Sequence, residues 1–185
     1  MNGNKVLGLI GLPGAGKDLL ADLFVKHNNF NKIAFADQIK KEYYEFSGFN
    51  EKMFKSNRKT DLELKIREGL WKYSDKMKKE FGDLHFITPV IQEIKKSKNP
   101  IFVTDVRTLD EIKELQKIDA QLICIVRELA RNNSKNIVPG TRLEFKDIFG
   151  IPVFWNYSNS VDVIYSDFIM FCKKALNIGW LNDKY

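Results

Sequence analysis

Five short apolar runs occur along the chain, each of a length typical of a buried β-strand. They predict strands at residues 6–12, 32–36, 101–106, 121–127 and 161–166. Segments with the spacing of amphipathic helices follow these runs, at residues 17–26, 38–46, 110–117 and 168–176. Strands that alternate with helices in this way predict an α/β fold, in which helices cover both faces of a parallel sheet.

Two longer segments interrupt this alternation. Residues 48–100 are rich in Lys and Glu and carry apolar stripes at helical spacing, and residues 128–157 are polar and contain Pro and Gly. A chain of 185 residues suits one domain with a substantial core. We therefore predict a single domain over residues 1–185, with a helical insertion at about 48–100 and a lid-like segment at about 128–157.

Composition and charge indicate which kinds of partner the protein can bind. The net charge is +6, which suits nucleic acid, a membrane surface or small polyanions such as nucleotides. The lysine clusters alternate with apolar residues, as solvated helix faces do, and we find no nucleic-acid-binding motif. These features favour small nucleotides over nucleic acid, and they leave a monomer or a homodimer open.

The cellular setting follows from apolar runs and cysteines. No run reaches the roughly 18 apolar residues that a membrane-spanning helix needs. Cys124 and Cys172 each lie inside an apolar run, which predicts two buried thiols and no disulfide. The expected location is a reducing cytoplasm.

The first candidate site follows the first predicted strand. Residues 11–18 read Gly11-Leu12-Pro13-Gly14-Ala15-Gly16-Lys17-Asp18 and match the phosphate-loop pattern G-x-x-x-x-G-K. Glycines allow the backbone to wrap around phosphate oxygens, and the amides at the following helix start point at the anion. Lys17 would reach the transferred phosphate of ATP. The loop thus predicts nucleotide binding.

Asp18 stands where this pattern usually has Ser or Thr. A carboxylate there can bind Mg²⁺ directly or through a water molecule. The alternative is an acidic residue that is favoured at a helix N-terminus by the helix dipole. Both interpretations remain open at this point.

A second carboxylate ends the predicted strand at residues 101–106. Ligands in open α/β sheets gather at the carboxyl ends of the strands, so Asp105 is a candidate for orienting Mg²⁺. The alternative is that Asp105 caps the next turn. Arg107 lies two residues further on and is a candidate for binding a phosphate.

Other polar residues extend the candidate site. Asp37 follows the second strand, where it can contact an acceptor hydroxyl or serve as the N-cap of a helix that begins at Gln38. Arginines suit phosphates because they are always charged and bind bidentately. Candidates of this type lie at the end of the fourth strand, in the lid-like segment and in the helical insertion: Arg127, Arg131, Arg142, Arg58 and Arg67.

Three of these segments together resemble the deoxynucleoside monophosphate kinases of the bacteriophage type. They are the loop ending in Gly16-Lys17-Asp18, the segment Phe35-Ala36-Asp37-Gln38-Ile39-Lys40, and the segment Asp105-Val106-Arg107-Thr108-Leu109-Asp110-Glu111. The likeness extends over most of the chain to about residue 127. The chain departs from the family at Leu19, where Thr is usual, and at Asn156-Tyr157-Ser158-Asn159, where the family often reads H-x-S-E.

The resemblance implies a P-loop fold with the strand order 2-3-1-4-5, an adenylate-kinase-like helical arm that binds the monophosphate, and a lid. It also implies transfer of the γ-phosphate of ATP, with Mg²⁺, to a nucleoside or deoxynucleoside monophosphate. Lys17, Asp18, Asp105 and Arg107 would then be catalytic, and Asp18 and Asp105 would serve the metal. Residues 11–19, Arg127 and Arg131 are candidates for the ATP side, and the acceptor candidates are Asp37, Lys40, Arg67, Arg107 and Arg142.

Two other functions stay open. A P-loop kinase could act on a different phosphorylated acceptor, such as dephospho-coenzyme A or phosphomevalonate, because the motifs do not identify the acceptor. A P-loop protein could also bind nucleotide or nucleic acid without phosphorylating a small molecule, which the basic charge would permit.

Overall fold

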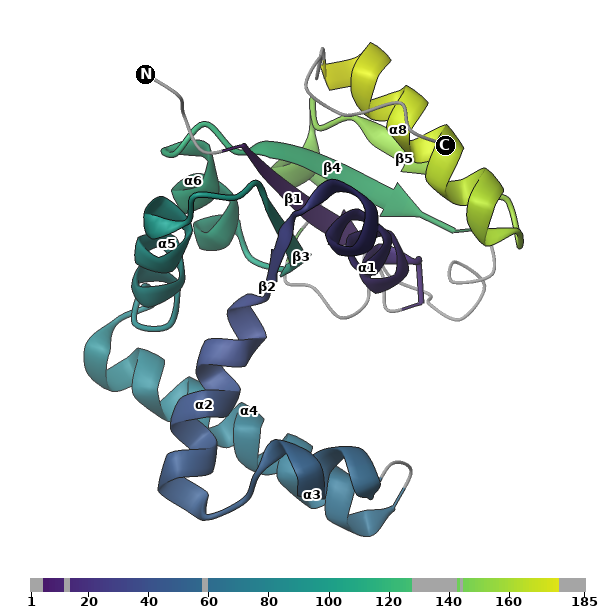
Figure 1. The fold of residues 1–185 in the computed structure, drawn as a ribbon. Helices are drawn as coiled ribbons and strands as arrows, with labels where there is room; N and C mark the ends of the chain where they lie inside the picture. The colour runs from purple at the N-terminus through teal and green to yellow at the C-terminus, as the bar shows by residue number, and fades with distance from the viewer. Residues whose placement is uncertain (1–4, 12–13, 58–59, 128–142, 144, 177–185) are drawn as a thin grey trace. The chain divides into compact units, whose positions relative to one another are not determined.

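The computed structural model describes residues 5–11, 14–57, 60–127, 143 and 145–176 (Figure 1). Five strands form one sheet in the order β2-β3-β1-β4-β5, and every neighbouring pair is parallel. The strands are β1 (Val6–Gly11), β2 (Asn31–Ile33), β3 (Ile101–Val106), β4 (Gln121–Val126) and β5 (Val153–Trp155). This arrangement confirms the predicted five-stranded parallel sheet and its strand order.

The chain divides into two compact units. The sheet unit comprises residues Met1–Ile33 and Ile94–Tyr185, and the helical unit comprises Ala34–Glu93. Among its described residues, the sheet unit carries the α-helices α1 (Lys17–Asn28), α6 (Leu109–Gln116) and α8 (Val161–Leu176) and the 3₁₀-helix η1 (Phe145–Ile148). The helical unit contains α2 (Phe35–Ser47), α3 (Glu51–Ser56), α4 (Asp61–Phe81) and most of α5 (Ile87–Lys96).

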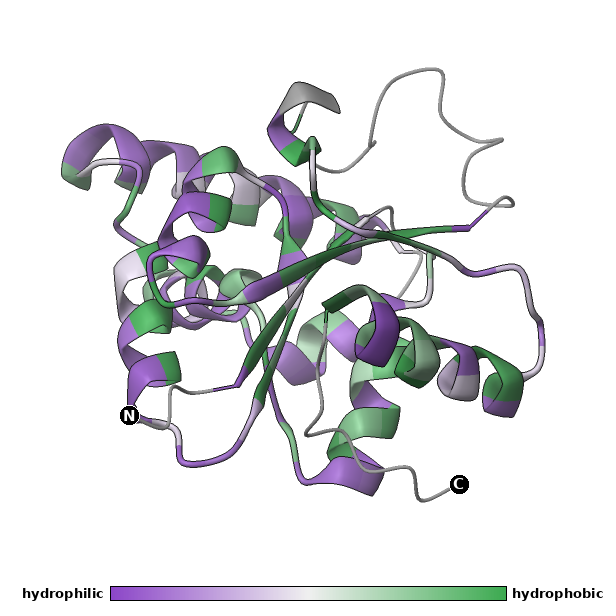
Figure 2. Ribbon diagram, turned by 90° about the horizontal axis from the view of Figure 1, so that it is seen from above, coloured by the Kyte–Doolittle hydropathy of each residue, from purple (hydrophilic) through white to green (hydrophobic). Residues whose placement is uncertain are grey.

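Helices pack on both faces of the sheet because side chains alternate along each strand. Leu7 and Leu9 of β1 point to one face and join a buried cluster with Phe24 of α1 and Phe168 of α8. Gly8 faces the other way, toward Leu115 of α6. The strands are mostly hydrophobic, whereas the helices carry both hydrophobic and hydrophilic residues (Figure 2).

The helical unit has a smaller core of its own. Tyr43 of α2, Phe54 of α3 and Ile66 of α4 are buried together. Two helices of this unit begin at side-chain caps, since Asn50 accepts a hydrogen bond from the Met53 amide and Thr60 accepts one from the Glu63 amide. The predicted insertion at 48–100 covers α3, α4 and α5, and α2 precedes it in the same unit.

The predicted position of the fifth strand is wrong. Residues 161–166 form the first part of α8, and β5 lies earlier, at Val153–Trp155, inside the predicted lid-like segment. The buried residues of α8 are Ile164, Tyr165, Phe168, Ile169 and Cys172. This spacing follows one face of a helix, whereas Val161 and Val163 are exposed, so tertiary packing overrides their preference for strands.

Two further expectations concern burial and membranes. Cys124 and Cys172 are buried free thiols, as predicted. None of the helices in the described part of the chain combines the length and the apolar character that crossing a bilayer requires.

Candidate functional site

A glycine-rich turn connects β1 to α1 at the carboxyl end of the sheet. Strand β1 ends at Gly11 and α1 begins at Lys17, with Gly16 as its N-cap. Gly14 and Gly16 have φ values of 82° and 99°, a region that L-residues rarely adopt. Leu12 and Pro13 lie outside the described residues. At Gly14 and Gly16 the turn thus adopts backbone conformations that few other residues could take.

The N-terminus of α1 is suited to an anion. Its first backbone hydrogen bond runs from the Leu20 amide to the Gly16 carbonyl, at 3.0 Å, and no side chain caps the helix start. A helix N-terminus presents backbone N–H groups and the positive end of the helix dipole. Together with the glycine turn, it provides the arrangement that binds phosphate groups in other proteins.

Lys17 is held at this helix start. Its Nζ donates a hydrogen bond to the Gly11 carbonyl at 2.8 Å, so the side chain folds back across the turn. Burial lowers the pKa of Lys17, and the positive charge of Arg107 lowers this pKa further. The nearby carboxylates of Asp18 and Asp105 act in the opposite direction. The sheet unit thus brings together the four residues that were predicted to be catalytic.

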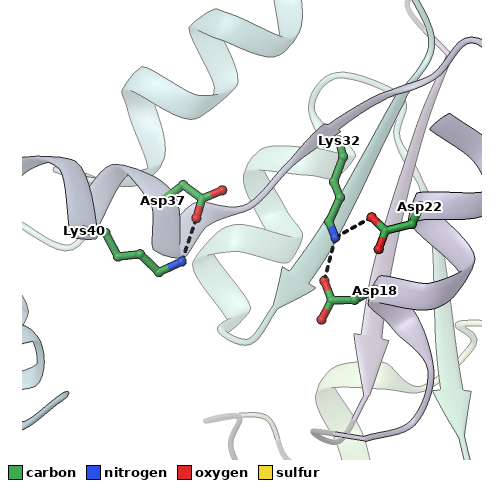
Figure 3. A network of polar contacts seen from close by, with 5 residues as sticks. All are labelled: Asp18, Asp22, Lys32, Asp37 and Lys40. Atoms are coloured by element: carbon green, nitrogen blue, oxygen red, sulfur yellow. Dashed lines mark hydrogen bonds and ion pairs between the residues drawn. The ribbon is translucent and has the colours of Figure 1, made fainter. Parts of the chain in front are cut away.

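Asp18 takes part in an ion-pair network that the sequence did not suggest (Figure 3). The ammonium of Lys32, from β2, lies 3.0 Å from an Asp18 oxygen and 3.0 Å from an Asp22 oxygen. Burial opposes the charge of Lys32, but the hydrogen bonds to the two aspartates outweigh it, so the pKa of Lys32 is raised. The Asp18 side chain is 77% exposed, so its carboxylate remains accessible to solvent.

Asp105 lies inside β3 and is only 7% exposed. Strand β3 pairs with β1, and Ile10 faces Val106 across the pair, so Asp105 lies beside the end of β1. The next helix, α6, has Thr108 as its N-cap in a capping box with Glu111. The N-cap of α6 is thus Thr108 and not Asp105.

The same capping box fixes the backbone that carries Arg107. An oxygen of Glu111 accepts hydrogen bonds from the Arg107 amide at 2.6 Å and from the Thr108 amide at 2.9 Å. The side chain of Arg107 is exposed. Its position after a buried strand and before a capped helix is therefore well defined, while its guanidinium remains accessible.

The helical unit holds three of the acceptor candidates. Asp37 and Lys40 form an ion pair at 2.9 Å on the first turns of α2 (Figure 3). Helix α2 begins at Phe35 with Ala34 as its N-cap, so the alternative role of Asp37 as an N-cap is wrong. Arg67 donates from Nε and Nη2 to one oxygen of Glu63, at 2.9 and 2.7 Å, and lies over the Phe54 ring.

The remaining candidates are scattered or not described. Arg127 follows β4 and donates to Asn159 at 2.7 Å, and Leu19 is an exposed residue in the first turn of α1. Arg58, Arg131 and Arg142 lie outside the described residues, as does most of the predicted lid-like segment.

Sequence reasoning missed three residues that support the candidates. Glu63, which holds Arg67, could have been found from its spacing of four residues on a helix. Lys32 and Asn156 could not, because each meets the site through a contact between distant segments. Asn156 is buried, and its amide donates to the Ala15 carbonyl in the phosphate loop.

Comparison with solved structures identifies the fold. No protein-family model and no curated protein matches the sequence. The solved structure of a dephospho-CoA kinase from Campylobacter jejuni aligns with 92% of this chain and 96% of its own, at 15% identity and a TM-score of 0.50. A shikimate kinase from Aquifex aeolicus aligns with 94% of this chain and 99% of its own, at 11% identity and a TM-score of 0.48. The chain has the fold of P-loop kinases.

Proposed function

We propose that this chain is an ATP- and Mg²⁺-dependent kinase that phosphorylates a nucleoside or deoxynucleoside 5′-monophosphate. The observation that carries the proposal is the position of Lys17. It begins a helix behind a glycine turn, next to two carboxylates and Arg107, at the carboxyl end of a parallel sheet. This is the part of a P-loop protein that holds the phosphates of a nucleotide.

On the donor side, the loop amides and Lys17 bind the phosphates of ATP. Lys17 stabilises the negative charge that spreads over the transferred phosphoryl group. Because burial and Arg107 both disfavour its charge, a bound polyanion restores favourable electrostatics around the ammonium. Residues 11–19 form this side, and Arg127 and Arg131 are further candidates for it.

Asp18 and Asp105 are the residues that would hold Mg²⁺. No cluster of three or more His, Cys, Asp or Glu side chains able to hold a metal occurs in the described ranges. Nucleotide-bound Mg²⁺ needs only one or two carboxylates, because phosphate oxygens and water complete its octahedron. The two carboxylates fit that requirement, and the ion would neutralise phosphate charge.

On the acceptor side, an oxygen of the acceptor's own phosphate attacks the γ-phosphorus of ATP in line with the bond to the β-phosphate oxygen. That bond breaks, ADP leaves, and the acceptor becomes a diphosphate. Arg107, Asp37, Lys40, Arg67 and Arg142 are the candidates for binding and orienting the acceptor. The protein contributes mainly position and electrostatic stabilisation.

A second candidate acceptor is dephospho-coenzyme A, which the structural likeness to the Campylobacter jejuni dephospho-CoA kinase favours. This acceptor would use the same donor side. The decisive difference lies in the acceptor residues, so both candidates belong in one substrate panel.

The test is a coupled assay for ADP formation with ATP and Mg²⁺ across the ribo- and deoxyribonucleoside monophosphates and dephospho-coenzyme A. We expect ADP and a matching diphosphate with one or a few monophosphates. Activity with dephospho-coenzyme A alone would reassign the acceptor. Absence of acceptor-dependent ADP throughout the panel would overturn the proposed kinase activity.

Lys17→Met links that activity to the phosphate loop. Removing the ammonium should lower kcat by at least about a hundredfold, since transition-state charge loses its main positive partner. Lys26→Met is the matched control, because Lys26 is an exposed lysine at the other end of the same helix. Equal turnover in the two variants would contradict the role of Lys17.

A further inference from the structure

Asn156 lies at the carboxyl edge of the sheet, one residue after β5. Its backbone amide donates to the Val126 carbonyl at 2.8 Å and so extends the pairing of β5 with β4. The flanking residues Trp155 and Tyr157 are exposed, and their rings stack on each other at an interplanar angle of 9°. Because side chains alternate along an extended segment, Asn156 points inward, where it is 2% exposed.

The inward side chain contacts two consecutive residues of the phosphate loop. Its Nδ2 donates a hydrogen bond to the Ala15 carbonyl at 3.0 Å. A Cβ atom added to Gly16 would lie 2.7 Å from the same Nδ2, closer than real Cβ contacts allow. Gly16 is thus required by its backbone conformation and also by the space that Asn156 occupies.

The two ends of the Asn156 carboxamide differ in their contacts. Its Oδ1 is buried and accepts no hydrogen bond from the part of the chain that the structure describes. A buried acceptor without a partner does not stabilise a protein, so this oxygen gives the carboxamide no favourable contact. The favourable contact that the carboxamide makes is the one to the loop.

We propose that Asn156 is a positioning residue that fixes the Ala15–Gly16 peptide of the phosphate loop. No cis peptide bond occurs among the described residues, so this peptide is trans, and its C=O and N–H groups point in opposite directions. Anchoring the Ala15 carbonyl to Asn156 therefore holds the Gly16 N–H pointing away from Asn156. This pre-orients one of the loop amides for the β- and γ-phosphates of the nucleotide. The inference rests on the proposed nucleotide site, but not on the identity of the acceptor.

Gln121 provides a matched control in the same sheet. Its Nε2 also donates to a backbone carbonyl, that of Leu176, and its Oε1 is also buried without a partner among the described residues. Gln121 begins β4 and pairs with Leu7, at the opposite end of the strands from the phosphate loop. Truncating either amide removes a similar interaction, but only one of them touches the loop.

The experiment compares the binding of ADP to the wild type, Asn156→Ala and Gln121→Ala by isothermal titration calorimetry. We expect the Kd for ADP to rise about tenfold in Asn156→Ala and to change less than twofold in Gln121→Ala. Inorganic tripolyphosphate, measured as a competitor of ADP, should lose affinity by the same factor, because the loop binds phosphate. If the alanine variant does not fold, Asn156→Ser is measured instead, with the same expected changes in the Kd for ADP.

Two outcomes would overturn the inference. One is an unchanged Kd for ADP in a folded Asn156 variant, which would make the residue merely structural. The other is weaker ADP binding with unchanged tripolyphosphate binding, which would assign Asn156 to the nucleoside instead of the loop. A wild type that binds ADP but phosphorylates no acceptor would refute the proposed function and leave this inference intact.

Discussion

The charge of Lys17 depends on residues from different segments of the chain. Burial and Arg107 lower its pKa, and the carboxylates of Asp18 and Asp105 oppose that shift. Asp18 is itself paired with Lys32. Single residues at this site therefore cannot be assigned roles from their type alone, and variants must separate donor effects from acceptor effects.

Substituting Arg107 can separate effects on the donor from effects on the acceptor. We predict that Arg107→Ala raises KM for the acceptor by about ten- to a hundredfold, because a charge-assisted hydrogen bond to phosphate is worth about 1.5–3 kcal/mol. KM for ATP should change less than threefold. Steady-state kinetics with each substrate varied in turn measures both values.

Lys113→Ala is the control for Arg107→Ala, because Lys113 is an exposed cation on the following helix α6. It should leave both KM values unchanged. Equal losses of affinity for ATP and acceptor in Arg107→Ala would move Arg107 to the donor side.

At the scale of elements, the packing of α2 against α4 depends on Gly69. A Cβ atom at this position would lie 1.9 Å from the Tyr43 hydroxyl and 2.7 Å from the ring carbon that bears it. Tyr43 is buried in the core of the helical unit and cannot move aside without disturbing Phe54 and Ile66. A glycine inside a helix, ordinarily unfavourable, is here required by the neighbouring helix.

We predict that Gly69→Ala lowers the free energy of unfolding by about 1–3 kcal/mol, the usual cost of overpacking. The sign of this change in the free energy of unfolding is informative, because Gly→Ala in an uncrowded helix interior stabilises by about 1 kcal/mol. Urea unfolding followed by circular dichroism measures the difference.

A double-mutant cycle with Tyr43→Ala provides the control. In the Tyr43→Ala background the added methyl group meets no hydroxyl, so Gly69→Ala should become neutral or stabilising. Stabilisation by Gly69→Ala in the wild-type background would contradict the close packing of the two helices.

Elements with a strong local signal could be predicted from the sequence, and those that depend on distant contacts could not. Residues 101–106 were predicted as a strand and form β3, because a continuous apolar run buried on both faces has few alternatives. Residues 161–166 are equally rich in branched residues, yet they form a helix, because only one of their faces meets the core. The three-residue strand β5 has one buried position, too little for any periodicity to show.

The same distinction holds for the candidate site. The phosphate loop and Asp105 could be found because strand, turn and helix follow one another in the sequence. Asn156 meets Ala15 across 141 positions of sequence, and its departure from the H-x-S-E pattern gave no indication of that contact. Contacts of this kind require the strand order and register, which place β5 two strands away from β1.

At the scale of the whole molecule, a net charge of +6 still has to be reconciled with a small-molecule substrate. Many lysines of the described chain form ion pairs with neighbouring carboxylates on exposed helices, such as Lys72 with Glu68 and Lys79 with Asp75. Such pairs contribute little to stability, but each places a carboxylate beside a lysine. These described pairs therefore offset positive charge locally, whereas a nucleic-acid-binding protein concentrates its cations on one face.

This pairing of lysines with carboxylates predicts a specific dependence of nucleic-acid binding on salt. A single-stranded 20-mer should bind weakly at 50 mM KCl and show no saturable binding at 150 mM, because lysines already paired with carboxylates engage few phosphates. ADP should still bind at 150 mM KCl, since the loop amides contact its phosphates directly. Fluorescence anisotropy of a labelled oligonucleotide, run beside calorimetry with ADP, measures both. Micromolar binding of the 20-mer at 150 mM KCl would instead favour a nucleic-acid-associated P-loop protein, and competition by ADP would then locate that binding at the phosphate loop.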